Sequence, residues 1–438
     1  MDLKINPIIN SLNGEIIAPG SKSYSHRAFI AASLAEGISI IKKPIDTGDV
    51  GITIDILRSL GVKIIKIDEN SYIVEHTSES FKSIKKVLDC KNSGTTIRIF
   101  SALGLLIKDG VILAGEFLKR KRPILPLLEA LSFLGGKYRL SEEGVHVKRT
   151  KNLCNKVKIP GDISSQFITA LLIVCPLLKC KNADYIEIEL TSPLVSVPYI
   201  KITIDVLNSF GIYIQEDYVK GKFYITNDQQ YRPQSYKIPG DFSSSSFIIV
   251  AAVLSRKPSK VIIKNLNTQN FQGDKKIIEI LTKMGANIQF DELRECISIN
   301  GNLNKFKLKG LDIDCRDIPD LFPILSILGA FAEGKTTLYN ASHLRNKESD
   351  RISIMARELT KMGVKIDEKS DKLTIFHSDK IKGIKISHEN DHRIAMACCI
   401  AALYANSSSL IENVQIIGDS YPSFLDDLKN LGALIEII

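Results

Sequence analysis

Short polar clusters, rich in side chains that bind anions or move protons, occur six times along this chain of 438 residues. They draw on Ser, Asp, Asn, Gln, Lys, Arg and His, and each opens a nearly all-apolar segment. Cations and hydroxyl groups hold phosphate and carboxylate groups, and carboxyl groups accept or donate protons. The residue types therefore indicate binding of acidic molecules together with acid–base chemistry. The clusters occupy residues 20–27, 91–98, 160–167, 239–247, 315–322 and 389–393.

The apolar segments behind the clusters predict six buried helices, because a helix that is apolar on every side normally lies in a core. Ser, Asp or Asn at the start of such a helix is typical of an N-cap. Each helix N-terminus carries unpaired N–H groups and about half a positive charge. Six such ends facing one cleft would attract anions before any Lys or Arg is counted. The alternative is that they are six ordinary capped helices.

A second series of six segments has amphipathic helical spacing and ends at glycine, as in residues 54–61. Glycine supplies the left-handed conformation that closes a helix, and a short β-prone stretch follows. The closing glycines lie 69 to 78 residues apart, which indicates six copies of one supersecondary unit. Each unit pairs a buried helix with an amphipathic one, joined by short strands. The glycines are Gly61, Gly135, Gly211, Gly285, Gly363 and Gly432.

The composition is that of an ordinary globular protein, with 44% hydrophobic and 24% charged residues. The length predicts roughly two to four domains. The eight cysteines form no CxxC motif, so neither a zinc ribbon nor a thioredoxin-type site is indicated, and a reducing cytoplasm is expected. The first residues lack the apolar stretch of a signal peptide, and no apolar run approaches the roughly 18 residues of a membrane span.

The net charge of +9 fits either nucleic acid or acidic small substrates as partners. One dense basic run, Lys119-Arg120-Lys121-Arg122, is typical of a solvated loop, and the other basic residues form no stripe. Binding of nucleic acid predicts basic residues interleaved with aromatic ones. The sequence has no Trp and only 7% aromatic residues, which favours acidic small substrates.

Nine motifs, in order along essentially the whole chain, resemble those of the enolpyruvylshikimate-phosphate synthases. Each motif alone is weak, but their shared order makes the resemblance specific. The motifs are Lys22-Ser23 with Arg27, Asn92-Ser93-Gly94-Thr95 with Arg98, Arg122-Pro123-Ile124, Ser164-Ser165-Gln166-Phe167, Ser196 with Pro198-Tyr199-Ile200, Ile318-Pro319-Asp320, Lys347-Glu348-Ser349-Asp350-Arg351, Asp391-His392-Arg393 and Tyr421-Pro422.

The resemblance implies an α/β fold, a mixed α+β prism of two similar domains with three βαβαββ repeats each. The total of six repeats agrees with the count from the closing glycines. The first domain is expected to comprise residues 1–20 and 239–438, and the second residues 21–238. Pro and Gly mark two expected hinge strands, near 19–21 and 238–241.

The resemblance also implies a transferase of the shikimate pathway, in chorismate and aromatic amino acid biosynthesis, which glyphosate inhibits. Such an enzyme moves the enolpyruvyl group of phosphoenolpyruvate to the 5-hydroxyl of shikimate 3-phosphate and releases phosphate. It needs cations for two phosphorylated acids and groups that transfer protons, but no metal and no other cofactor. We expect a cytoplasmic monomer with small-molecule partners, and neither nucleic acid nor membrane among them.

The roles of the site residues follow from the matching motifs. Asp320 is expected to take the hydroxyl proton, while Glu348 and Lys22 share the remaining proton transfers in a division that stays open. The residues expected to bind shikimate 3-phosphate are Lys22, Ser23, Arg27, Ser164, Ser165, Gln166, Ser196, Asp320, His343 and Lys347. The residues expected to bind phosphoenolpyruvate are Lys22, Asn92, Gly94, Arg122, Gln166, Arg351 and Arg393.

Several of these positions also have a purely structural interpretation. Glu348 and Arg351 stand three residues apart on an expected helix and could form a surface ion pair. Asp320, directly after Pro319, could be an N-cap or a first-turn acid. His392 is expected to be a hydrogen-bonded packing residue rather than a catalytic one.

Three departures from the family pattern concern the anion-binding residues. Asp419 stands where the family often has a phosphate-contacting Lys, and His343 stands where many members have Asn. Ile99 and Ser93 replace a common Pro and a common Ala, and they flank Gly94. We therefore expect weaker binding of phosphoenolpyruvate and glyphosate than in relatives that carry the Lys.

Two other functions are alternatives. The sister enolpyruvyl transferase that acts on UDP-N-acetylglucosamine usually carries a Cys in the loop before the Arg-Pro motif, and residues 115–122 contain none. A nucleic-acid-end-processing protein of a related repeat fold would account for the positive charge, but it predicts basic–aromatic clusters that the sequence lacks.

Overall fold

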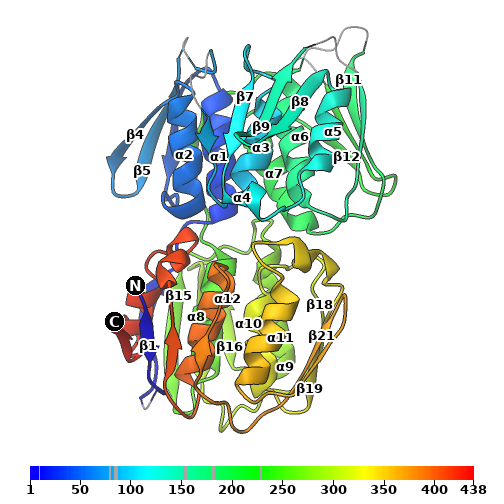
Figure 1. The fold of residues 1–438 in the computed structure, drawn as a ribbon. Coiled ribbons are helices and arrows are strands. Elements are labelled where there is room, and N and C mark those ends of the chain that lie inside the picture. The colour runs from blue at the N-terminus through cyan, green and yellow to red at the C-terminus, as the bar shows by residue number, and fades with distance from the viewer. Residues whose placement is uncertain (9, 78–79, 83–86, 151–154, 179–182, 227–228) are drawn as a thin grey trace. The chain divides into compact units, whose positions relative to one another are not determined.

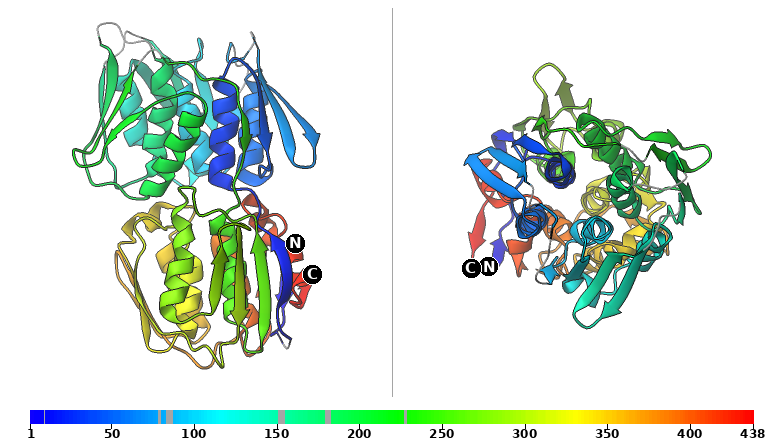
Figure 2. Two further views of the ribbon diagram at one scale, coloured as in Figure 1. Left: turned by 180° about the vertical axis from the view of Figure 1, so that it is seen from behind. Right: turned by 90° about the horizontal axis from the view of Figure 1, so that it is seen from above.

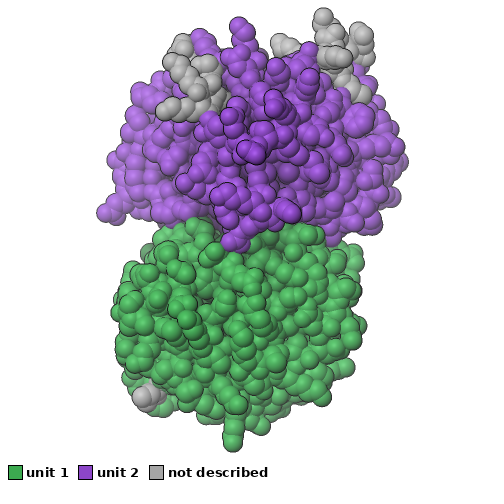
Figure 3. Space-filling view, viewed as in Figure 1, with its two compact units in different colours: residues 1–19, 239–438 green, residues 20–238 purple. Residues whose placement is uncertain are grey.

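The chain forms two units (Figure 3). Each has a hydrophobic core of its own. Unit 1 consists of Met1–Pro19 and Pro239–Ile438, and unit 2 consists of Gly20–Ile238. The domain and hinge boundaries expected from the sequence stay a prediction. The computed structural model describes residues 1–8, 10–77, 80–82, 87–150, 155–178, 183–226 and 229–438.

Six inner helices, counted over these described residues, are buried along almost their whole length, as their all-apolar sequences predict. Each begins at one of the polar clusters. No helix in the described part of the chain combines the length and the apolar character that a membrane crossing requires. Unit 2 contains α1 (Lys22–Leu34), α3 (Gly94–Leu103) and α6 (Ser165–Val174), and unit 1 contains α8 (Phe242–Val253), α10 (Phe322–Phe331) and α12 (His392–Leu403).

The amphipathic series forms the outer helices. In α9 the buried residues Ile277, Ile280 and Leu281 recur at helical spacing. The closing glycines have positive φ angles, 82° at Gly61 and 99° at Gly285, so the predicted helix ends are confirmed. The outer helices are α2 (Gly48–Ser59), α5 (Leu125–Phe133), α7 (Val197–Ser209), α9 (Lys276–Met284), α11 (Arg351–Lys361) and α13 (Phe424–Asn430), and a short α4 (Glu116–Lys119) precedes α5.

Within the described ranges, each unit contains three four-stranded sheets of one topology, in which a parallel pair is extended by two antiparallel strands. The sheets of unit 2 are β14 (Ser235–Lys237), β3 (Gly37–Lys42), β5 (Ser71–His76), β4 (Lys63–Asp68); β6 (Leu88–Asp89), β7 (Val111–Ala114), β9 (Gly144–Arg149), β8 (Gly136–Ser141); and β10 (Lys156–Ile159), β11 (Tyr185–Leu190), β13 (Lys222–Thr226), β12 (Gln215–Asp217). Those of unit 1 are β16 (Ile288–Asp291), β17 (Cys296–Gly301), β15 (Ser259–Lys264), β2 (Asn13–Ile17); β18 (Asp312–Asp314), β19 (Lys335–Tyr339), β21 (Leu373–Phe376), β20 (Ile366–Glu368); and β22 (Lys385–Ile386), β23 (Ser409–Ile411), β1 (Leu3–Ile5), β24 (Ile435–Ile437).

One repeat illustrates how the elements connect. β6 leads through the buried α3 to β7, which is parallel to it with Leu88 opposite Leu113. The amphipathic α5 and the antiparallel strands β8 and β9 follow. A parallel pair needs such a crossover connection, and in Figure 2 the helices of each unit run side by side with strands outside them. This βαβαββ order confirms the predicted α/β fold class.

Several strands complete sheets far from their own place in the sequence. β2 pairs in parallel with β15, with Glu15 opposite Ile262, and β14 pairs with β3, with Tyr236 opposite Ile41. β1 lies between β23 and β24, and Figure 1 shows both termini beside it. The N-terminal segment therefore belongs to unit 1 through backbone hydrogen bonds.

Among the described inner helices, the N-cap prediction is confirmed at four and wrong at two. Side-chain caps come from Ser93, Ser164, Asp241 and Asp391. Ser21 makes no side-chain cap bond to α1, and α10 begins after Leu321. Asp320 is no N-cap because arginine side chains hold its carboxylate, as described below.

Candidate active site

Lys22 and Arg27 lie on the first turns of α1 in unit 2. Lys22 Nζ donates a hydrogen bond to Asp49 Oδ2 over 3.3 Å, from the first turn of α2. Arg27 is buried and donates through Nε to Thr203 Oγ1 at 2.7 Å and through Nη1 to the Ser23 carbonyl at 2.8 Å. Burial lowers the pKa of Arg27 to about 10, so the guanidinium stays charged at neutral pH. The start of α1 therefore holds two cations in fixed positions.

The start of α3 lies against the guanidinium of Arg122. Nη1 of Arg122 donates to the Asn92 carbonyl at 3.0 Å, and the ring centroid of Phe117 lies 4.8 Å from the guanidinium carbon. A Cβ atom at Gly94 would lie 3.0 Å from Arg122 Nη2, so glycine permits this close approach. The helix N-terminus and the guanidinium are both positive, and an anion beside them would be stabilised by both.

Gln166, at the start of α6, is oriented by Arg98. Arg98 Nη1 donates to Gln166 Oε1 at 2.5 Å, and Gln166 Nε2 donates to Thr95 Oγ1 at 2.9 Å. Arg98 itself is buried, donates to the Pro123 carbonyl at 2.6 and 3.2 Å, and lies 5.1 Å from the ring centroid of Phe167. Because Oε1 is taken by the guanidinium, Gln166 presents its N–H₂ end as a donor.

The predicted serines lie at two helix starts in unit 2. Ser164 caps α6 by accepting a hydrogen bond from the Gln166 N–H over 3.3 Å, and Ser165 follows it in the buried first turn. Ser196 precedes α7 with a φ of 58°, a left-handed conformation that costs energy in a residue other than glycine. Its buried Oγ has no hydrogen-bond partner among the described residues. The Ser196 hydroxyl is therefore available to a ligand.

In unit 1, Asp320 and Glu348 meet at one buried arginine. Arg351, which begins α11, donates through Nη1 to Asp320 Oδ1 at 2.8 Å and through Nη2 to Glu348 Oε2 at 3.0 Å. Its Nε donates to Asp391 Oδ2 at 2.9 Å. The second oxygen of Asp320 lies 2.9 Å from Arg393 Nη2. Glu348 and Arg351 do form an i,i+3 pair, but the Arg351 side chain is only 1% exposed, so the surface ion pair alternative is wrong.

The surrounding charges set the basicity of Asp320. Burial acts to raise its pKa, but the positive charges of Arg393, Arg351 and Lys347 outweigh burial and hold the pKa well below its usual range. In the same way, carboxylates outweigh the effect of burial on Arg351 and raise its pKa. Without a ligand, Asp320 is therefore ionised and a weak base.

His343 lies in the 3₁₀ helix η3 (Ser342–Asn346), close enough to this group for its charges to affect the ring. Burial, with the charges of Lys347 and Arg351, lowers the pKa of His343 to about 3, so the ring is neutral at neutral pH. Its Nε2 is buried and has no hydrogen-bond partner in the described part of the chain. A neutral imidazole can donate or accept one further hydrogen bond there, as an Asn side chain could.

Asp419 and His392 belong to the same unit. Asp419 ends the 3₁₀ helix η4 (Val414–Asp419), which packs against α12. Arg393 stands in the first turn of α12, and His392 before it is buried. Asp419, which stands where the family often has a Lys, therefore lies on an element that packs against the helix carrying Arg393.

Comparisons with known proteins agree with one another. The sequence profile described as EPSP synthase (3-phosphoshikimate 1-carboxyvinyltransferase) matches residues 7–428. The chain belongs to the EPSP synthase family. A relative from Methanocaldococcus jannaschii named 3-phosphoshikimate 1-carboxyvinyltransferase is 44% identical over 430 residues, 97% of each chain. One of the same name from Methanococcus maripaludis is 41% identical over 434 residues, 98% of each chain.

Solved structures show the same fold. EPSP synthase from Acinetobacter baumannii has a TM-score of 0.81 and 25% identity, with 99% of each chain covered. The enolpyruvyl transferase NikO from Streptomyces tendae has a TM-score of 0.77 at 18% identity, covering 99% of this chain and 98% of that one. The likeness to NikO concerns the fold alone.

In this member of the EPSP synthase family the predicted site residues fall into two sets, one in each unit. Unit 2 carries Lys22, Ser23, Arg27, Asn92, Gly94, Arg122, Ser164, Ser165, Gln166 and Ser196. Unit 1 carries Asp320, His343, Lys347, Glu348, Arg351 and Arg393.

Sequence reasoning missed the residues that hold these side chains in place. Arg98 and Asp391 stand in recognised motifs and within the polar clusters, but neither had an expected role in ligand binding or catalysis. Asp49 reaches Lys22 from another helix, and nothing in the sequence marks that contact.

Proposed function

We propose that the protein transfers the enolpyruvyl group of phosphoenolpyruvate to the 5-hydroxyl of shikimate 3-phosphate, with release of phosphate, in aromatic amino acid biosynthesis. The family and the names of the relatives support this reaction. One observation supports this reaction at the level of individual residues. The ionised Asp320 lies between Arg351 and Arg393, and Glu348 pairs with Arg351. Such a group can bind an anion and move a proton next to it.

Phosphoenolpyruvate carries a carboxylate and a phosphate, and we assign its clamps to arginines. Arg122, Arg351 and Arg393 are buried, and a guanidinium fork can hold a carboxylate or phosphate at two points. The Gly94 backbone and the N–H₂ end of Gln166 add donors that need no charge. Asn92 and Lys22 complete the proposed set.

Shikimate 3-phosphate carries a phosphate, a carboxylate and hydroxyl groups. We propose that Ser164, Ser165 and Ser196 hold this molecule, together with Arg27 and Lys347. The unpartnered Ser196 Oγ and His343 Nε2 support ligand contacts at those positions. Ser23, Gln166, Lys22 and Asp320 complete the proposed set.

The proposed chemistry is an addition followed by an elimination. Asp320 accepts the proton of the 5-hydroxyl, the oxygen bonds to C2 of phosphoenolpyruvate, and Glu348 or Lys22 gives a proton to C3. The intermediate then loses phosphate from C2 and a proton from C3, which restores the double bond. Positioned acids and bases are expected to accelerate such steps by about 10²–10⁴-fold each.

A product analysis in deuterium oxide tests this proposal. The vinyl methylene of the product should carry deuterium, because C3 is protonated and deprotonated in turn, and one phosphate should appear for each ether formed. Formation of the ether without any deuterium at C3 would exclude the addition–elimination route.

The remaining expectations stay predictions. They are the absence of a cofactor or metal, the absence of nucleic-acid and membrane partners, the monomeric state and the cytoplasmic location. UDP-N-acetylglucosamine as acceptor is not favoured, because the matching relatives are named for shikimate 3-phosphate chemistry.

A further inference from the structure

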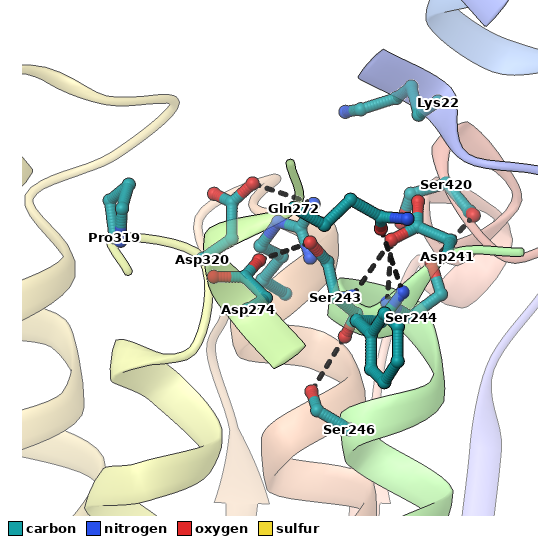
Figure 4. Close-up of polar contacts among 12 residues, drawn as sticks. Lys22, Asp241, Ser243, Ser244, Ser246, Gln272, Asp274, Pro319, Asp320 and Ser420 are labelled. Atoms are coloured by element: carbon teal, nitrogen blue, oxygen red, sulfur yellow. Dashed lines mark hydrogen bonds and ion pairs between the residues drawn. The ribbon is translucent and has the colours of Figure 1, made fainter. Parts of the chain in front are cut away.

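Asp274 is a buried carboxyl group to which the proposed reaction gives no role. It lies in the 3₁₀ helix η2 (Gly273–Lys275), which leads into α9, and it is 2% exposed. Ser243, in the first turn of α8, donates from Oγ to Asp274 Oδ2, as Figure 4 shows. The other oxygen, Oδ1, is buried and has no hydrogen-bond partner in the described ranges.

The loop before α9 fixes Asp274 against the start of α8. Gln272 Oε1 accepts a hydrogen bond from the Phe242 N–H at 3.0 Å, and Gln272 Nε2 donates to the Gly240 carbonyl at 2.8 Å. These two bonds tie the loop to the backbone on both sides of residue 241. Asp274 therefore cannot move away from α8 without breaking them.

Packing alone does not account for a carboxyl group at this position. An ionised carboxylate out of water is strongly unfavourable unless it is paired. Asp241 already caps α8, accepting hydrogen bonds from the N–H groups of Ser243 at 2.8 Å and Ser244 at 3.4 Å. Asp274 is therefore not needed to satisfy the helix start.

The charges that face Asp274 belong to the proposed catalytic group. Burial and the charge of Asp320 raise the pKa of Asp274 to about 7, with a smaller contribution from Asp241, while Arg393 and the Ser243 hydrogen bond oppose the rise. The adjacent Lys275 donates its Nζ to backbone carbonyls of its own loop. Figure 4 shows the side chain of Asp320 next to that of Asp274, and the raised pKa of Asp274 places its ionisation near neutral pH.

Counting formal charges leads to the same conclusion. Three cations in this region, Arg351, Arg393 and Lys347, stand with three carboxylates, Asp320, Glu348 and Asp391. Asp241, whose charge also acts on Asp274, adds a further negative charge, so ionisation of Asp274 makes the region more negative still.

We propose that Asp274 is a positioning residue that adjusts the basicity of Asp320 through Arg393. With Asp274 neutral, the charge of Arg393 acts together with those of Arg351 and Lys347 to keep Asp320 a weak base. With Asp274 ionised, Arg393 is shared between two carboxylates, and the added negative charge makes Asp320 bind a proton more readily. The inference rests on the proposed function, in which Asp320 takes the hydroxyl proton.

The first test compares kcat of the parent and of Asp274→Asn at saturating substrates between pH 6 and pH 8. The kcat of the parent divided by that of the variant should rise about fivefold over this range, because one added negative charge close to a base raises its basicity on this scale. A purely structural Asp274 gives a ratio that does not change with pH, and that result overturns the proposal. Glu279→Gln, which removes an exposed acid of α9, should give a constant ratio.

Ser243→Ala provides a second variant. It removes the donor that lowers the pKa of Asp274, so the inflection in the kcat profile should move to higher pH. An inflection at the parent's pH contradicts the proposal.

Infrared difference spectroscopy on the ligand-free parent and on Asp274→Asn does not depend on enzyme activity. The parent should show a protonated-carboxyl band that the variant lacks, and this band should disappear as the pH rises through about 7. Spectra in which Asp274 is ionised throughout pH 5–8 would overturn the inference. A parent that is inactive with both substrates at every pH would instead contradict the proposed function.

Discussion

The Arg351 guanidinium donates a hydrogen bond from Nη1 to Oδ1 of Asp320 over 2.8 Å. Arg393 lies 2.9 Å from the other oxygen of the same carboxylate. Two cations proposed to bind phosphoenolpyruvate therefore already hold the proposed base. A bound anion would take up part of their charge, and Asp320 would then bind a proton more readily. Substrate binding and proton removal would thus be coupled through these arginines.

Asp320→Asn and Glu348→Gln should each lower turnover at least about 100-fold while substrate binding stays within about tenfold. The amides keep the shape of the side chains but cannot take up or deliver the proton. Steady-state kinetics combined with equilibrium binding separates the two effects. Glu292→Gln, which changes an exposed acid of the same unit, serves as the control. Full activity of either variant would remove that residue from the catalytic group.

The repeat pattern made most of the fold predictable. Apolar runs such as 168–174 mark inner helices, and glycines such as Gly61 and Gly285 end the outer ones. What the pattern could not show is the pairing of distant strands, since β2 and β14 join sheets whose other strands lie elsewhere in the chain. Backbone hydrogen bonds between such segments leave no local signal in the sequence.

The sequence identified site residues only where they stand in a recognisable motif. Asp320 looked like a helix cap because it stands after Pro319, and only tertiary contacts with Arg351 and Arg393 show why it does not cap α10. Asp274 was not predicted, because an acid at the start of an outer helix is typical of a solvated first turn. Its burial depends on the contact with Ser243 of α8, which lies 31 residues earlier in the same repeat unit and leaves no local pattern in the sequence.

Arg98→Lys should raise the KM for phosphoenolpyruvate about tenfold, with a smaller effect on kcat. Lysine keeps the charge but loses the fork that joins Gln166 to the Pro123 carbonyl, so the Gln166 amide is no longer oriented. Arg139→Lys, at an exposed position of unit 2, is the matched control. An unchanged KM would show that the Arg98 contacts do not orient a ligand group.

Asp419→Lys should lower the KM for phosphoenolpyruvate or the inhibition constant of glyphosate. Many relatives are expected to carry a phosphate-contacting Lys at this place, and a hydrogen bond to a charged group contributes about 1.5–3 kcal/mol. Asp426→Lys adds the same charge on the exposed side of α13 and controls for net charge. If both constants of Asp419→Lys stay within about twofold of the parent, Asp419 lies outside the anion site.

Asp274→Asn should stabilise the protein relative to the parent at pH 8 but much less at pH 5. The folded-state pKa of Asp274 is raised to about 7, mainly by burial, whereas an unfolded Asp titrates near 3.9. The parent therefore loses stability as the pH rises between these values, by about 4 kcal/mol in all, of which about 3 kcal/mol falls between pH 5 and pH 8. The variant is spared that loss. Urea unfolding at both pH values measures the difference. Equal effects at pH 5 and pH 8 would mean that Asp274 titrates normally.

Phosphate release from phosphoenolpyruvate, followed with and without shikimate 3-phosphate after exhaustive treatment with a chelator, tests the central claim most directly. The account predicts steady release only when shikimate 3-phosphate is present, with no added metal or nucleotide, and none when UDP-N-acetylglucosamine replaces it. Loss of activity after chelation, or equal release with UDP-N-acetylglucosamine, would contradict the account.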